Sequence, residues 1–152
     1  MAQSITFSYH QRVYEIITPV QVSLPLSEKE IHSQDQRLYA TTALWDTGAT
    51  NSVITEKTAL QLGLKPIDSA TVYHAGGVSQ QPVYLVNIYL PNGAIIPDAM
   101  VTGCPDTTGK FGVIIGMNVI SYGDFAFTNV GSQSVFSFRM PSTETVDYMK
   151  TS

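Results

Sequence analysis

Three adjacent residues carry the strongest chemical signal in the sequence. Asp46, Thr47 and Gly48 directly follow an apolar stretch that ends at Trp45. Such a stretch would drive the Asp46 carboxylate into a partly dry cleft, where a carboxylate can take up or give a proton during a reaction. The Thr47 hydroxyl could lock the loop, and Gly48 lets the backbone turn tightly so that an N–H group approaches the carboxylate. Taken alone, however, the tripeptide is most simply an ordinary turn.

The surroundings of the tripeptide favour a functional role. Ala43-Leu44-Trp45 precedes it, Ala49-Thr50 follows it, and a second apolar element, Ile114-Ile115-Gly116, comes about 70 residues later. Together these segments resemble the retropepsins, the retroviral-type aspartic proteases, in their bacterial or mobile-element branch. The resemblance extends from about residue 20 to about residue 140, which is most of the chain.

The resemblance implies an all-β, single-domain fold, a closed β-barrel or sandwich with two short helices. It also implies an aspartic endopeptidase that acts on polypeptides and needs no cofactor or metal. Hydrolysis by carboxylates needs two of them: one activates a water, and the other, protonated, hydrogen-bonds the carbonyl oxygen. Because the chain contains one Asp-Thr-Gly, the second carboxylate would come from Asp46 of an identical chain. We therefore expect a homodimer.

The resemblance also assigns the remaining residues of the site. Thr47, Gly48 and Ala49 would support the catalytic loop, and Ile114, Ile115 and Gly116 would pack beneath it. A flap that closes over the substrate would be formed by Ala75, Gly76, Gly77 and Val78. The two glycines fit an ordinary hairpin turn equally well, and the neighbouring His74 is more simply a strand residue than a catalytic one.

The sequence departs from the retroviral pattern at several positions. Thr50 and Met117 stand where the retroviral enzymes tend to have an acid and an arginine that form an ion pair supporting the dimer, whereas Asn118 matches. Because both charges are absent together, no buried charge is left unpaired. Ala49 replaces a serine whose hydroxyl would lower the pKa of the carboxylate. We therefore expect an activity optimum in mildly acidic solution.

The elements expected around these residues are mostly strands. Alternating or continuous apolar residues predict strands in several segments, which are residues 5–9, 20–24, 38–45, 71–74, 83–90, 95–96, 113–115, 124–130 and 134–140. A short helix is expected after Thr55, with Ala59, Leu60 and Leu62 on its apolar side and Gly63 at its end. A second short helix should follow Gly116. The polar stretch 26–37 is expected to be an exposed connection.

Composition excludes several other classes of protein. The 152 residues carry 8 basic and 12 acidic side chains without a Lys/Arg cluster, so nucleic-acid binding is not expected. No apolar run is long enough to span a bilayer, and the start of the chain lacks the apolar segment of a signal peptide. The single Cys104 is compatible with a reducing compartment, which favours a cytoplasmic location. We place the domain at residues 1–141 and a polar tail at 142–152.

Two other readings of the same residues remain open. The fold could serve as a catalytically silent peptide-binding or dimerisation module, because a fold alone does not establish a reaction. The protein could also be a self-processing protease of a phage or mobile element. The first of these would bind peptides without cutting them, and the second would cleave a longer precursor of its own chain.

Overall fold

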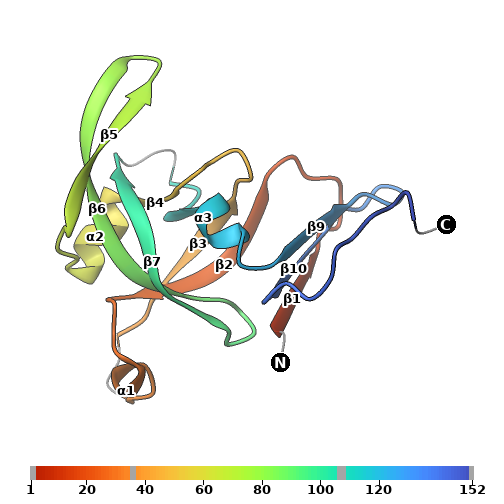
Figure 1. The fold of residues 1–152 in the computed structure, drawn as a ribbon, viewed down its shortest axis with the longest axis horizontal. Helices are drawn as coiled ribbons and strands as arrows, with labels where there is room; N and C mark the ends of the chain where they lie inside the picture. Colours follow the sequence, from red (N-terminus) through yellow and green to blue (C-terminus); the bar gives the residue numbers. More distant parts are fainter. Residues whose placement is uncertain (1–2, 35–36, 106–108, 151–152) are drawn as a thin grey trace.

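The computed structural model describes residues 3–34, 37–105 and 109–150. Within these ranges the chain is mostly β, as expected (Figure 1). The strands are β1 (Gln3–Ser8), β2 (Ile16–Ser23), β3 (Tyr39–Trp45), β4 (Ser52–Thr55), β5 (Asp68–His74), β6 (Gly77–Tyr89), β7 (Ile95–Cys104), β8 (Val113–Ile115), β9 (Asp124–Thr128) and β10 (Val135–Met140). The helices are α1 (Glu28–Ile31), α2 (Glu56–Leu62) and α3 (Met117–Ile120). None of the helices in these ranges is long and apolar enough to cross a membrane.

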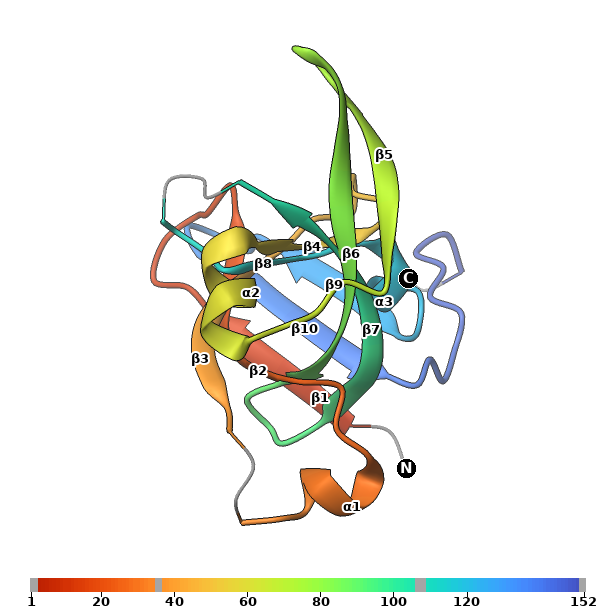
Figure 2. The same cartoon turned by 90° about the vertical axis from the view of Figure 1, so that its left-hand side faces the viewer.

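The larger of the two sheets positions the segments of interest. Its strand order is β2-β3-β8-β4-β7-β6-β5, and β2 also pairs with β6. The parallel pairing of β3 with β8 brings Trp45 opposite Ile115, although the two residues are far apart in the sequence. The hairpin of β5 and the first half of β6 projects away from the rest of the molecule (Figures 1 and 2).

The smaller sheet joins the two ends of the described chain. Its order is β1-β10-β9, and all its pairings are antiparallel. Phe136 and Phe138 of β10 are buried against Trp45, with ring centroids 4.9 and 5.0 Å from the indole. The indole N–H donates to the hydroxyl of buried Thr18 over 2.9 Å. The residue that precedes Asp46 is therefore fixed by both packing and a hydrogen bond.

The helix after Thr55 forms as predicted, but one of its residues was placed on the wrong face. Thr55 caps α2 by accepting a hydrogen bond from the backbone of Thr58, and Gly63 ends the helix in the left-handed conformation at φ 68°. Leu60, expected on the apolar side, is 80% exposed. The buried positions of α2 are Thr58 and Ala59, because the helix has two turns and contacts the sheet along a narrow strip.

Two short elements were not predicted from the sequence. Helix α1 lies in the stretch expected to be an exposed connection, where Ser27 and Glu30 form a reciprocal capping box. None of its residues is buried, so the stretch is exposed as predicted but helical. Strand β4 directly follows the Asp-Thr-Gly loop and pairs with β7 and β8. Its four residues are too few for a clear alternating pattern.

Candidate active site

Asp46 lies at the end of β3, where the chain leaves the sheet. Its backbone N–H donates to the carbonyl of Ile115 over 2.9 Å, which continues the pairing of β3 with β8. The Asp46 carboxylate accepts a hydrogen bond of 2.8 Å from the Gly48 N–H, and its carbonyl accepts one of 3.2 Å from the Ala49 N–H. The carboxylate is therefore held by its own loop, with the glycine N–H against it.

The loop after Asp46 is open to solvent. Thr47, Gly48 and Thr50 are exposed, and Asp46 and Ala49 are half-buried. A carboxylate at such a position is accessible to a water molecule or a substrate. The described part of the chain does not cover this face of the loop.

The Ile114-Ile115-Gly116 segment lies against the loop from the other side. Ile115 and Gly116 are buried, and Ile114 is half-buried. A Cβ atom on Gly116 would lie 2.7 Å from the carbonyl oxygens of both Ala49 and Asn51, so only glycine permits this approach of the two backbones. The first residues of α3 also bind the loop, since the Met117 N–H donates to the Ala49 carbonyl over 2.7 Å and the Asn118 N–H to the Thr50 carbonyl over 3.1 Å.

A partly buried polar network supports this arrangement. Ser52, at the start of β4, donates from its N–H and its hydroxyl to the Asn118 side-chain oxygen, and its hydroxyl accepts from the Gly116 N–H over 2.9 Å. The Asn118 amide donates to the Met100 carbonyl over 3.0 Å. Sequence reasoning noted Asn118 but missed Ser52. A lone serine in an apolar stretch gives no signal of its partner, because that partner lies 66 positions away.

The residues predicted to form a flap lie at the tip of the projecting hairpin. Ala75 and Gly76 form the turn between β5 and β6, and Gly77 opens β6 at φ 124°, a conformation that strongly favours glycine. Val78 is 60% exposed. The backbone N–H of Gly76 donates to Nδ1 of His74 over 3.1 Å, so this histidine holds the turn. This role of His74 was not predicted from the sequence.

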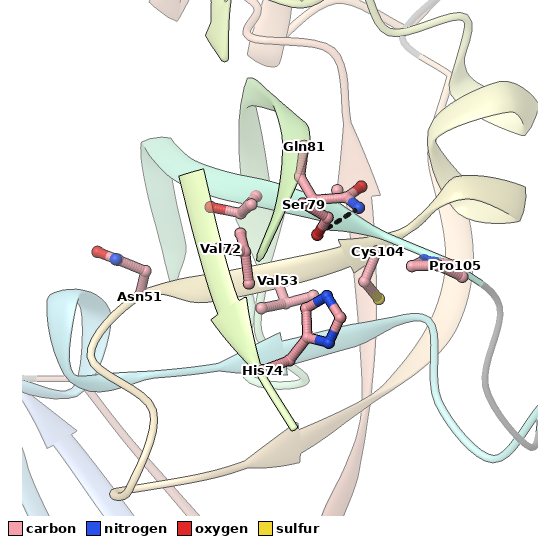
Figure 3. A pocket seen from close by; sticks show the side chains of 10 residues that line it. Asn51, Val53, Val72, His74, Ser79, Gln81, Cys104 and Pro105 are labelled. Atoms are coloured by element: carbon pink, nitrogen blue, oxygen red, sulfur yellow. Dashed lines mark hydrogen bonds between the residues drawn. The ribbon is translucent and has the colours of Figure 1, made fainter. Parts of the chain in front are cut away.

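A pocket of about 560 Å³ lies between the hairpin and the body of the sheet (Figure 3). The hairpin contributes Val72, His74, Ser79 and Gln81 to its lining, and β4, β7 and the residues next to them contribute Asn51, Val53, Thr102, Gly103, Cys104 and Pro105. Asp46 is not among the lining residues, but Asn51 connects the pocket to the Asp46 loop.

The structure brings together some of the predicted residues and separates others. The residues of the loop, which are Asp46, Thr47, Gly48 and Ala49, meet Ile114, Ile115 and Gly116 at the end of β3 and β8. The hairpin tip, formed by Ala75, Gly76, Gly77 and Val78, is a separate group, and none of these residues is among those that line the pocket. Among the described residues, no cluster of three or more His, Cys, Asp or Glu side chains could hold a metal ion.

Comparison with known proteins identifies the family. A sequence profile of the family described as aspartyl protease matches residues 35–119, more than half of the chain. The chain therefore belongs to the aspartyl protease family. The match includes the Asp46 loop, the hairpin and the start of α3.

A solved structure of similar architecture supports the fold, and two others align less closely. A retropepsin-like aspartic protease from Rickettsia conorii aligns over 92% of this chain and 96% of its own, with a TM-score of 0.57 and 13% identity. The simian foamy virus (mac) protease aligns over 69% and 93%, with a TM-score of 0.44 and 18% identity. The EIAV protease in complex with the inhibitor HBY-793 aligns over 70% and 85%, with a TM-score of 0.47 and 18% identity. A search among curated proteins finds no significant match.

Proposed function

We propose that the protein is an aspartic endopeptidase whose catalytic group is Asp46. The observation that carries the proposal is the Asp46 loop itself, in which an accessible carboxylate accepts the Gly48 N–H over 2.8 Å within a chain of the aspartyl protease family. A carboxylate fixed in this way can exchange protons with a water molecule held beside it. Thr47, Gly48 and Ala49 keep it in place, and Ile114, Ile115 and Gly116 support them from beneath.

The second carboxylate comes from a second copy of the chain. The remaining described aspartates lie on β5, β7, β9 and in the C-terminal segment, and none follows β3 or β8. A homodimer that places two Asp46 loops on a two-fold axis supplies the missing group. The exposure of Thr47 and Thr50 supports this assembly, because a partner loop would cover them. In the dyad, one ionised Asp46 activates the water and the other, protonated, binds the carbonyl oxygen, as in aspartic proteases generally.

The substrate is an extended polypeptide that lies between the Asp46 loop and the hairpin. Ala75, Gly76, Gly77 and Val78 form the flap, whose strands offer backbone groups for pairing with an extended chain. The pocket beside His74 and Val53 receives one substrate side chain. No cofactor or metal takes part in this reaction.

Three further assignments belong to the same proposal. The added pairing of β2 with β6 supports a closed barrel made of β2, β3, β8, β4, β7 and β6. Residues 1–141 form the protease domain, and residues 142–152 form its tail. The single cysteine of the chain, Cys104, suits the reducing conditions of the cytoplasm.

The decisive experiment mixes the parent with Asp46→Asn and measures cleavage of a peptide library between about pH 2 and 7. Asp46→Asn should lose at least about a hundredfold in rate. In an equal mixture with freely exchanging subunits, about one quarter of the dimers carry two intact Asp46 residues, so activity should fall below the half expected of independent monomers. Asp98→Asn, an exposed change on β7, is the control and should leave the rate unchanged.

Two outcomes would contradict the proposal. If the equal mixture has one half of the activity of the parent and the protein has a monomeric mass in solution, the dyad shared between two chains is excluded. A parent that binds peptides and cuts none of them would instead favour the peptide-binding module. An optimum below about pH 3 would contradict the expectation drawn from Ala49.

A further inference from the structure

His74 uses its two ring nitrogens in different ways. Nδ1 accepts the Gly76 N–H over 3.1 Å and thereby holds the turn at the hairpin tip. Because Nδ1 acts as an acceptor, the hydrogen of the neutral ring must lie on Nε2. No hydrogen bond from Nε2 to another described residue is formed, so this N–H is a donor without a partner in the described part of the chain.

The imidazole ring projects into the pocket between the hairpin and the sheet (Figure 3). Of the other polar side chains on the hairpin side, Ser79 and Gln81 are hydrogen-bonded to each other over 3.3 Å. Val53 and Val72 give the pocket apolar walls. The described lining residues include no carboxylate, lysine or arginine, so the pocket provides no fixed counter-charge for a cationic side chain.

We propose that His74 determines which substrate side chain enters this pocket. This inference rests on the proposed function. The pocket selects a side chain with an alkyl stem and a terminal carbonyl oxygen, of the glutamine or glutamate type. The stem packs on Val53 and Val72, and the oxygen accepts the Nε2–H of His74.

A purely structural role for His74 makes a different prediction. If the ring only holds the turn, then any side chain that accepts the Gly76 N–H would replace it without changing which peptides bind. Asparagine is the informative substitution, because its Oδ1 takes the place of Nδ1 while the side chain ends before the position of Nε2. His74→Asn therefore keeps the turn and leaves no donor at the position of Nε2, because its amide N–H groups lie closer to the backbone, whereas His74→Phe removes both nitrogens.

The test measures peptide binding to Asp46→Asn and, in parallel, cleavage by the protein with Asp46 intact. Each position of a set of octapeptides carries in turn glutamine, glutamate, methionine or lysine. Methionine is nearly the same size as glutamine but lacks the acceptor. At one position, glutamine should bind about three- to tenfold more tightly than methionine, and lysine should bind least well. His74→Asn should remove the difference between glutamine and methionine while keeping the melting temperature.

A second measurement avoids substitutions at the hairpin. In ¹⁵N NMR of the protein with ¹⁵N-labelled histidine, the glutamine peptide should shift the Nε2 resonance of His74, and the methionine peptide should leave it in place. Such a shift supports the inference even if the His74 variants fold poorly. Its absence on binding of the glutamine peptide overturns it.

The outcomes separate this inference from the proposed function. Cleavage without preference for glutamine or glutamate over methionine overturns the role of His74 and leaves the protease. If His74→Asn keeps the preference for glutamine or glutamate over methionine, the role of His74 in selection is likewise overturned, and the residue only holds the turn. Selective binding that depends on His74 without cleavage overturns the protease and keeps the pocket. If no peptide is bound or cut, both proposals are wrong.

Discussion

The side-chain oxygen of Asn118 accepts two hydrogen bonds from Ser52, one of 2.9 Å from the backbone N–H and one of 2.7 Å from the hydroxyl. This contact ties α3 to β4, the elements on either side of the Asp46 loop. Helix α3 has four residues, too few to be stable by its own hydrogen bonds. The position of α3, and with it the two backbone hydrogen bonds to Ala49 and Thr50, therefore depends on this contact between buried Ser52 and half-buried Asn118.

Asn118→Ala should lower the free energy of unfolding by about 1–3 kcal/mol, because the N–H and hydroxyl of buried Ser52 lose their acceptor. Urea denaturation measures the change. Gln61→Ala, which removes an exposed amide from α2, is the control and should cost less than about 0.5 kcal/mol. Equal effects of the two substitutions would mean that the network does not stabilise the fold.

Thr18→Val should destabilise the protein through Trp45. The indole N–H donates to the Thr18 hydroxyl in a fully enclosed position, and valine leaves that donor without an acceptor. We expect a loss of about 1–3 kcal/mol in the free energy of unfolding. In a Trp45→Phe background the same substitution should cost less, because no indole N–H remains. A double-mutant cycle in which the two changes simply add would rule out this coupling.

Gly116→Ala should disturb the Asp46 loop itself. The new Cβ would meet the Ala49 and Asn51 carbonyl oxygens at 2.7 Å, and a backbone cannot move aside as a flexible side chain can. We expect a loss of about 1–3 kcal/mol in stability, together with weaker peptide cleavage, because the loop must shift. Ser121→Ala, an exposed change at the end of α3, is the control. A variant with parental stability and cleavage would contradict the close approach.

The C-terminal segment should loosen in acid. The Asp124 carboxylate accepts a hydrogen bond from the Ser142 hydroxyl and one of 2.7 Å from the Arg139 guanidinium. These two bonds hold the pKa of Asp124 below its ordinary range. A carboxyl with a lower pKa in the folded state stabilises the fold above its unfolded pKa, and this stabilisation is lost as the pH falls through the folded value.

The difference in melting temperature between the parent and Asp124→Asn should therefore be present at about pH 6 and shrink below about pH 4. Thermal unfolding followed by circular dichroism at a series of pH values measures it. Asp98→Asn serves as the comparison on β7. A difference for Asp124→Asn that stays constant over the whole range would exclude the carboxylate as its cause.

Local sequence patterns predicted much of the fold but little of the tertiary support. Thr55 and Gly63 delimit α2 as predicted, because caps depend on residues within one turn. Leu60 was placed on the wrong side, since periodicity in a seven-residue helix cannot distinguish neighbouring faces. Ser52 and His74 were missed as contacts for another reason. Their partners are set by how the sheet and hairpin fold, and a single sequence does not record such pairings.

The length of β6 has a mechanical consequence. This strand runs for 13 residues, pairing with β5 near its start and with β2 and β7 farther along, so one unbroken backbone belongs to both the hairpin and the body of the sheet. The hairpin tip is thus the unsupported end of this strand, and from Val83 onward the strand is held in place because most of its residues are buried. A force on the tip would therefore bend the hairpin gradually along its ladder of hydrogen bonds. The hairpin would not rotate about a single hinge residue. Shortening the hairpin by removing one cross-strand pair would therefore stiffen it and reduce how far its tip can move.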